Sequence, residues 1–172
     1  MDNLTRLAEQ LGQSLVARSA KVSTAESCTG GGIAEAITRI AGSSAWFEAG
    51  YVTYSNEQKT RQLGVPAMLF EQVGAVSREV VEAMVCGAQR NNGAHFVVAV
   101  SGIAGPGGGS PEKPVGTVWL GWAAGNALYA RCYHFSGDRL AIRMQAVEAG
   151  LSGLLELCNG GNPDTNCRAI AS

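Results

Sequence analysis

The apolar positions of the chain follow two periods, one helical and one extended. Leucines recur every three or four positions over residues 3–18, which predicts a helix with one buried face. Capping residues mark other helices, because Ser55 and Gly64 bound one of them and Ser77 begins another. With these two included, the other predicted helices cover residues 32–40, 56–63, 66–72 and 78–91. A last helix begins at Ser136-Gly137-Asp138 and runs to about Cys158.

Short apolar runs bounded by turn residues predict the strands of a sheet. Residues 95–103 are almost continuously apolar, as is typical of a central strand covered on both faces. Gly125-Asn126 joins two later runs and is a strong hairpin signal. The predicted strands cover residues 21–25, 47–54, 95–103, 115–123 and 127–135. Since helices and strands alternate before the hairpin, the pattern predicts a three-layer α/β/α sandwich with a mixed sheet.

Length and composition are consistent with one globular domain. The chain has 172 residues, of which 46% are hydrophobic and 16% are charged, and chains of this size rarely divide into two domains. We assign residues 1–159 to a single domain. We expect the glycine-rich end, residues 160–172, to be a disordered tail, and we assign no role to Cys167 within it.

Charge and hydropathy exclude several classes of protein. The net charge of −1 and the absence of a basic stripe argue against a nucleic-acid partner. No apolar run reaches the ~20 residues of a membrane span, and the N-terminus lacks the features of a signal peptide. We therefore expect a cytoplasmic protein. The five cysteines are odd in number and form no CxxC pair, which argues against a disulfide framework and a structural zinc site.

The first candidate for chemistry is Ser27, which follows the first predicted strand and precedes the glycines at 30–32. N–H groups at the start of the next helix, and the positive end of its dipole, can hold an oxyanion. The glycines would let a substrate approach without a clash against Cβ atoms. These features favour Ser27 as a nucleophile. In the alternative interpretation Ser27 only caps the helix, as serine often does.

A serine nucleophile needs a base, and lysine is the better candidate in this chain. The two histidines, His95 and His134, fall in predicted strands, and no GxSxG motif is present. Lys59 lies in the helix after the second strand, whereas Lys21 precedes the first strand and Lys113 falls in a glycine-rich loop. A lysine base must be neutral, so it needs burial or a nearby cation to lower its pKa. The alternative is that Lys59 is an ordinary solvated lysine.

Cys28 is a rival nucleophile, because helix N-termini lower the pKa of thiols. The alternative for Cys28 is a small buried residue at a packed turn. The carboxylates are scattered and no HxxxH pattern occurs, so we expect no metal and no cofactor.

A glycine-rich loop follows the central strand at residues 101–109. Ligands bind at the carboxyl ends of such strands, and loops rich in N–H groups suit phosphate. The loop lacks both the GxxxxGK[ST] and the GxGxxG patterns. Arg139 and Arg143, in the first turns of the last helix, can pair with a phosphate. In the alternative interpretation the loop and both arginines are solvated surface features.

Five segments of the chain occur together, and in the same order, in one known family. They are TAESCTGGGIAEAIT, GSSAWFEAGYVTYSNEQK, GAVS, VAVSGIAGPGGGSPEKPVGTVW and FSGDR. Over about residues 5–157 the chain resembles the nicotinamide-nucleotide amidases, also described as the C-terminal domain of the competence/damage-inducible protein CinA. The resemblance implies a mixed, mostly parallel five-stranded sheet and association as a homodimer or larger homo-oligomer. The apolar stretch at residues 45–47, which we expect outside the core, adds to the second expectation.

The resemblance implies that a small nucleotide is the substrate. The family hydrolyses the carboxamide of nicotinamide mononucleotide to nicotinic acid mononucleotide and ammonia, without a metal, and so recycles pyridine nucleotides. Its serine falls on Ser27, its lysine on Lys59 and its motif tyrosine on Tyr54. The residues that we expect to hold the oxyanion or the substrate are Thr29, Gly30, Gly31, Asn56, Ser101, Gly102, Gly105 and Arg143.

Two functions of other classes remain open at this point. One is a nucleotide-binding regulatory module without catalysis, and the intact set of Ser27, Tyr54 and Lys59 counts against it. The other is a DNA-associated protein, which only the competence name of the family suggests and which the near-zero net charge opposes.

Overall fold

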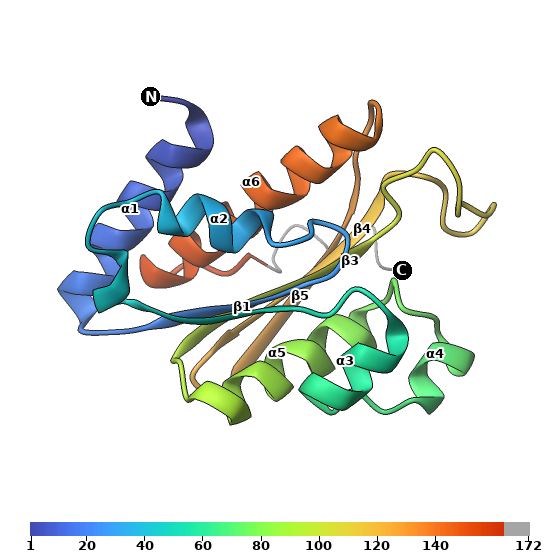
Figure 1. Cartoon of the computed structure of the whole chain (residues 1–172), viewed down its shortest axis with the longest axis horizontal. Helices are drawn as coiled ribbons and strands as arrows, with labels where there is room; N and C mark the ends of the chain where they lie inside the picture. Colours follow the sequence, from blue (N-terminus) through green and yellow to red (C-terminus); the bar gives the residue numbers. More distant parts are fainter. Residues whose placement is uncertain (164–172) are drawn as a thin grey trace.

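In a computed structural model that describes residues 1–163, the chain forms a five-stranded sheet between two layers of helices (Figure 1). The first half contains α1 (Asn3–Arg18), β1 (Val22–Glu26), α2 (Gly32–Thr38), the short 3-10 helix η1 (Ser43–Ala45), β2 (Phe47–Val52), α3 (Asn56–Leu63) and α4 (Met68–Gln72). The second half contains α5 (Arg78–Asn92), β3 (Phe96–Gly102), β4 (Thr117–Ala124), β5 (Ala127–His134) and α6 (Arg139–Cys158).

The strands lie in the order β2-β1-β3-β4-β5. β1 pairs in parallel with both β2 and β3, while β4 is antiparallel to β3 and to β5. Of the strands in the described part of the chain, β4 alone therefore runs against the direction of the others. This confirms the prediction of a mixed, mostly parallel sheet in a three-layer α/β/α sandwich.

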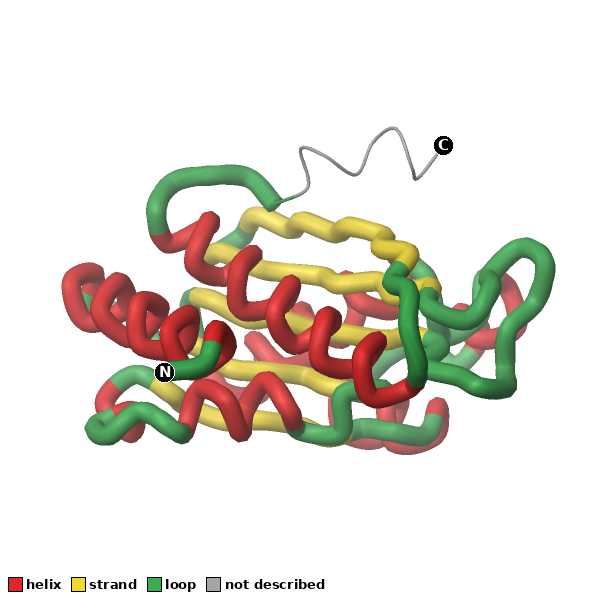
Figure 2. The backbone as a smooth tube through the Cα atoms, turned by 90° about the horizontal axis from the view of Figure 1, so that it is seen from above, coloured by secondary structure: helices red, strands yellow, loops and turns green. Residues whose placement is uncertain are grey.

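The two helical layers bury different faces of the sheet, as Figures 1 and 2 show. Helices α1, α2 and α6 cover one face, over an apolar cluster that includes Leu11, Ile33 and Trp122. Helices α3, α4 and α5 lie on the other face, where Leu63 and Met84 belong to a second cluster. Central strands buried on both faces follow from this arrangement, and β1 is buried along its whole length.

The predicted elements are present, and several end a little earlier or later than expected. Helix α1 matches its prediction, and the hairpin turns at Gly125-Asn126 as expected. The first strand begins and ends one residue later than predicted, and the strand predicted over 47–54 stops at Val52. The residues after Val52 leave the sheet and turn toward β1, where the Thr53 N–H donates to the Glu26 carbonyl at 2.9 Å.

The expectation that residues 45–47 lie outside the core is wrong for Trp46. Its side chain is 4% exposed and packs against Gly12 of α1, where a Cβ would lie 2.5 Å from the indole ring. The glycine in α1 creates the room for the ring. The expectation of a homo-oligomer consequently rests on the family resemblance alone.

The C-terminal end of α6 continues in hydrogen-bonded structure beyond the predicted domain boundary. The Gly160 N–H donates to the Leu157 carbonyl at 3.1 Å, and the Gly161 N–H donates to the Glu156 carbonyl at 2.8 Å. The rest of the predicted tail, residues 164–172 with Cys167, lies outside the described residues. Every helix along residues 1–163 is too short or too polar to cross a membrane.

One close backbone contact sets the distance between α3 and α5. A Cβ on Gly87 of α5 would lie 1.8 Å from the Leu63 carbonyl oxygen at the end of α3, which is far inside van der Waals contact. The missing side chain therefore lets α3 dock directly on α5. Because α3 also carries Lys59, this contact helps to fix where that lysine lies relative to the sheet.

We predict that Gly87→Ala destabilises the protein, although alanine is the better helix former by about 1 kcal/mol. The new methyl group would displace the α3 backbone, and overpacking of this kind costs about 1–3 kcal/mol. Urea denaturation should show the lower free energy of unfolding. Gly107→Ala is the control, since no atom lies within 4 Å of its added Cβ. Equal midpoints for the two variants would contradict the proposed steric role of Gly87.

Candidate active site

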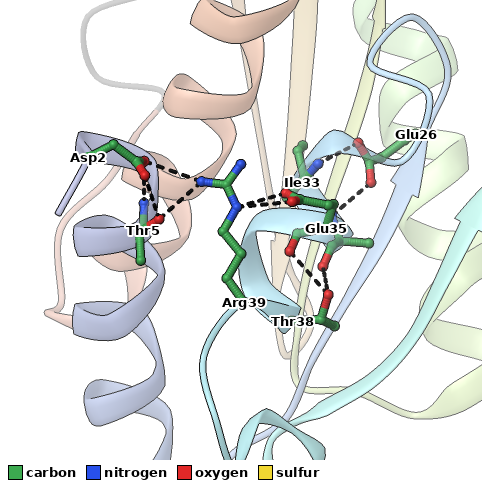
Figure 3. A network of polar contacts seen from close by, with 8 residues as sticks. Asp2, Thr5, Glu26, Ile33, Glu35, Thr38 and Arg39 are labelled. Atoms are coloured by element: carbon green, nitrogen blue, oxygen red, sulfur yellow. Dashed lines mark hydrogen bonds and ion pairs between the residues drawn. The ribbon is translucent and has the colours of Figure 1, made fainter.

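The N-terminal end of α2 is capped by the carboxylate of Glu26, the last residue of β1. This side chain is 0% exposed and accepts hydrogen bonds from the N–H groups of Ile33 (2.8 Å) and Ala34 (3.0 Å) and from the Thr29 hydroxyl (2.6 Å). Figure 3 shows Glu26 directed at the first turn of the helix. The alternative in which Ser27 caps α2 is therefore wrong, because the neighbouring carboxylate already occupies that place.

A second network holds α2 against α1. The Arg39 guanidinium, just after α2, pairs with Glu35 at 2.9 Å and with Asp2 at 3.2 Å (Figure 3). Asp2 also caps α1, since its carboxylate accepts from the Thr5 N–H at 3.0 Å. The start of α1 and the end of α2 are thus joined by a single arginine, while Glu26 holds the other end of α2.

Ser27 faces away from α2. Successive residues of an extended strand point to opposite faces of a sheet, so Glu26 reaches the α2 side and Ser27 the α3 side. The Ser27 N–H donates to the Val100 carbonyl of β3 at 3.0 Å, which fixes the residue to the central strand. Its Oγ donates to the Tyr54 carbonyl at 3.3 Å. The hydroxyl is therefore directed at the loop between β2 and α3.

Lys59 reaches the same carbonyl from α3. Its Nζ donates to the Tyr54 carbonyl at 2.8 Å, and the residue is 1% exposed. The Ser27 hydroxyl and the Lys59 amine thus meet at one backbone oxygen. Burial lowers the pKa of Lys59 to about 8, which makes an appreciable neutral fraction available near neutral pH. Of the two causes expected for a lowered pKa, burial or a nearby cation, burial is the one found at Lys59.

The turn after Ser27 presents backbone N–H groups. Gly30 and Gly31 have φ values of +60° and +100°, a left-handed backbone that other residues rarely adopt. The Gly30 N–H is used within the turn, since it donates to the Ser27 carbonyl at 3.0 Å. Within residues 1–163, the N–H groups of Cys28, Thr29 and Gly31 have no acceptor. Of the residues expected to hold the oxyanion or the substrate, Thr29 and Gly31 thus have N–H groups available in this turn, and Gly30 does not.

The thiol beside Ser27 is in the wrong environment for a nucleophile. Cys28 is 6% exposed and belongs to the apolar cluster under α1, α2 and α6. Burial raises the pKa of its thiol to about 11, so the reactive thiolate is scarce at neutral pH. The structure therefore favours the packing role of Cys28 over the rival chemistry.

Tyr54 contributes its backbone to the site and directs its ring elsewhere. The side chain is 59% exposed, and its hydroxyl accepts a hydrogen bond from Arg139 Nη2 at 3.2 Å. Arg139 Nη1 also donates to the Gly105 carbonyl at 2.8 Å. The exposed Arg139 thus connects the loop after β2 with the glycine-rich loop after β3.

The remaining expected residues lie around this arrangement in different roles. Ser101 is buried at the end of β3, and a Cβ on Gly102 would lie 2.6 Å from Val118. Asn56 is exposed in the first turn of α3. Arg143 of α6 does not point at open space, because its Nε donates to the Cys28 carbonyl at 3.0 Å and its Nη2 to the Thr29 carbonyl at 3.3 Å. It therefore contacts the backbone of the turn after Ser27.

The competing bases are engaged elsewhere. Lys21 pairs with Glu48 on the surface at 3.1 Å, and Lys113 Nζ donates to the Val73 carbonyl at 2.6 Å. His134 lies on β5, 3.5 Å from the Thr117 hydroxyl, and the His95 ring contacts Phe96 edge to face. Across the described residues, no group of three or more His, Cys, Asp or Glu side chains is arranged to hold a metal.

The role of Glu26 at the start of α2 is not among the predictions from the sequence. The sequence does carry one signal for it. An acidic residue that ends a strand and precedes a glycine-rich helix start has free N–H groups within reach, and carboxylates are favoured there.

Together these features define a class of protein: a three-layer α/β/α sandwich that presents a serine hydroxyl, a buried amine and backbone N–H donors at the carboxyl end of its central parallel strands. Residues 4–158 match the model of the CinA C-terminal domain. The chain belongs to the CinA C-terminal domain family.

Relatives and solved structures agree with this membership. The chain is 68% identical over 157 residues to the nicotinamide-nucleotide amidohydrolase PncC of Pseudomonas putida, covering 91% of this chain and 98% of that protein. It is 55% identical over 154 residues to the protein of the same name from Escherichia coli K12, covering 88% and 92%. The crystal structure of the competence/damage-inducible protein CihA from Agrobacterium tumefaciens superposes with a TM-score of 0.88 at 43% identity, covering 92% and 97%.

The burial of Lys59 generates a stability prediction. We expect Lys59→Met to raise the melting temperature at pH 7, because methionine fills similar volume without a buried ammonium that has to be desolvated. A gain of about 1 kcal/mol would correspond to about 2–4 °C for a domain of this size.

The gain should depend on pH in a defined direction. Below the folded pKa of about 8, the wild type carries the full cost of the buried charge. From that pH up to the unfolded value of 10.5, the unfolded chain binds more protons, so the stability of the wild type rises with pH. The advantage of Lys59→Met should therefore shrink between these values in thermal melts. A constant difference would contradict the assignment of a buried charge.

Proposed function

We propose that this protein hydrolyses the carboxamide of nicotinamide mononucleotide to nicotinic acid mononucleotide and ammonia, in the recycling of pyridine nucleotides. The relatives named nicotinamide-nucleotide amidohydrolase support deamidation of this nucleotide. The observation that carries the chemical part is the meeting of the Ser27 hydroxyl and the buried Lys59 amine at the Tyr54 carbonyl.

The first half of the proposed reaction forms an acyl-enzyme. Neutral Lys59 takes the proton from Ser27, and the Ser27 oxygen attacks the amide carbon of the substrate. Negative charge develops on the carbonyl oxygen, where the available N–H groups of the turn, those of Cys28, Thr29 and Gly31, can stabilise it. Protonated Lys59 gives the proton to the nitrogen, the C–N bond breaks, and ammonia leaves.

The second half returns the enzyme to its starting state. Neutral Lys59 accepts a proton from water, the resulting hydroxide attacks the ester of Ser27, and the Ser27 oxygen leaves with the proton from Lys59. The products are free enzyme and the carboxylic acid. Lys59 acts as base and then as acid in both halves, so a pKa of about 8 suits it better than the ordinary value of 10.5.

The nucleotide part of the substrate needs hydrogen-bond donors and positive charge. Arg143 is largely committed to backbone carbonyls, so we assign the phosphate instead to Arg139. Among residues 1–163 its exposed guanidinium uses two of five donors, on Gly105 and Tyr54, which leaves three for a ligand. The end of β3 with Ser101 and Gly102, the following loop with Gly105, the exposed Tyr54 ring and Asn56 would supply the walls around the ribose. The substrate is thus held between the loops after β2 and β3.

Ser27→Ala tests the proposed nucleophile. We expect ammonia release from nicotinamide mononucleotide to fall by at least about 10³-fold, because the covalent step is lost. The fold should persist, since Glu26 and not Ser27 caps α2. Cys28→Ala is the control and should keep most of the activity. Wild-type turnover in a folded Ser27→Ala protein would exclude Ser27, and an inactive wild type that still binds the nucleotide would favour a regulatory module.

The pH dependence tests the proposed base. With a pKa of about 8, roughly a tenth of Lys59 is neutral at pH 7 and about nine tenths at pH 9. Turnover should therefore rise about tenfold per pH unit below pH 7 and level off above pH 9. Lys59→Arg should be nearly inactive across this range, because guanidinium does not release its proton. An active Lys59→Arg protein with an unchanged profile would remove Lys59 from the reaction.

A further inference from the structure

We infer that Arg143 is a positioning residue that aims the N–H groups of the turn after Ser27, and that it is not a ligand of the substrate phosphate. This inference rests on the proposed function for its kinetic consequences. Its structural part, the orientation of the turn, stands on the geometry alone.

Arg143 reaches the turn from α6, on the opposite side from Lys59. Its Nε donates to the Cys28 carbonyl at 3.0 Å, and its Nη2 donates to the Thr29 carbonyl at 3.3 Å. One edge of the planar guanidinium therefore holds two successive carbonyls of the main chain. A guanidinium can use this edge to bind an anion with two hydrogen bonds, but here two backbone carbonyls occupy it.

Peptide planarity converts this contact into the direction of a donor. In a trans peptide the C=O and the following N–H point in opposite directions. When Arg143 draws the Cys28 carbonyl toward α6, the Thr29 N–H must point away from α6. The Thr29 carbonyl accepts two hydrogen bonds, one from Arg143 and one from the Gly32 N–H at 3.0 Å. The N–H of the same peptide group belongs to Gly30 and donates to the Ser27 carbonyl. The two peptide planes after Cys28 are thereby fixed.

The turn is shaped to admit this side chain. A Cβ on Gly30 would lie 3.2 Å from Arg143 Nη2, and the φ of Gly30 is +60°. Glycine is thus favoured at this position both by the backbone conformation and by the close approach of the guanidinium. A cationic donor also polarises the carbonyls that it holds, which strengthens the N–H groups of the same peptides as donors.

Glu26 and Arg143 hold the turn from its two ends. Glu26 fixes the Thr29 side chain through the hydroxyl, and Arg143 fixes the Thr29 main chain through the carbonyl. The Thr29 N–H has no acceptor among the described residues. It is therefore a free donor whose direction these two contacts determine. Loss of Arg143 should leave the Glu26 contacts in place, so the helix should remain folded while this peptide gains freedom.

The kinetic test compares Arg143→Gln and Arg143→Lys with a control variant, Arg61→Gln. Arg61 is exposed on the surface of α3, and its one ion pair within the described residues is with Glu57. We expect Arg143→Gln to lower kcat by about 10²-fold, the usual cost of a lost oxyanion donor, with KM changed less than about threefold. Arg143→Lys keeps the charge but cannot make the bidentate contact, so its kcat should lie between those of Arg143→Gln and the wild type. Arg61→Gln should match the wild type.

A substrate without the phosphate separates positioning from phosphate binding. The fold-loss of kcat in Arg143→Gln should be the same for nicotinamide mononucleotide and for nicotinamide riboside. Added guanidinium ion should restore part of the activity of Arg143→Gly. A rise in KM with kcat preserved, or a loss confined to the phosphorylated substrate, would overturn the inference and assign Arg143 to the phosphate.

Backbone NMR tests the structural part without any substrate. We expect the amide resonances of Thr29 and Gly30 to shift or broaden in Arg143→Gln, while those of Ile33 and Ala34, bonded to Glu26, stay unchanged. Unaltered Thr29 and Gly30 resonances would overturn the positioning role. If the wild type released no ammonia from nicotinamide mononucleotide, the proposed function would fail, and these spectra would still decide the role of Arg143.

Discussion

The arrangement at the carboxyl end of the sheet depends on one buried carboxylate, that of Glu26. A fully buried charge is costly unless hydrogen bonds replace its lost water. Here three donors do so, from Thr29, Ile33 and Ala34. The same residue accepts the Thr53 N–H through its carbonyl, so it connects β1 to α2 through the side chain and to the loop after β2 through the main chain.

Because side chains alternate between the two faces of a strand, capping α2 and presenting a free hydroxyl fall to two adjacent residues. Glu26 points to the α2 face and satisfies the helix start, and Ser27, one residue later, points to the α3 face with its hydroxyl free for other partners. Lys59 approaches on that second face from α3, which is docked closely on α5 at Gly87. The serine and lysine thus come together because strand geometry and helix packing converge on one carbonyl.

The fold followed from the sequence because its signals are local. The leucine spacing of α1, the cap at Ser77 and the turn at Gly125-Asn126 each act over a few residues and appear where predicted. Ser27 and Lys59 were found as candidates because a glycine-rich turn after a strand and a shortage of other bases are visible in the sequence. What could not be predicted depends on contacts between segments far apart in the chain. The burial of Trp46 against Gly12 and the hydrogen bonds from Arg143 to the turn after Ser27 are contacts of this kind.

The shared acceptor of Ser27 and Lys59 is a main-chain oxygen. Every residue type carries the same carbonyl, so this contact does not depend on the side chain at position 54. The ring of Tyr54 is exposed, and its hydroxyl meets Arg139 instead. In the proposed reaction one residue would therefore serve two ends through different atoms, since its carbonyl would hold the reacting groups and its ring would face the bound nucleotide.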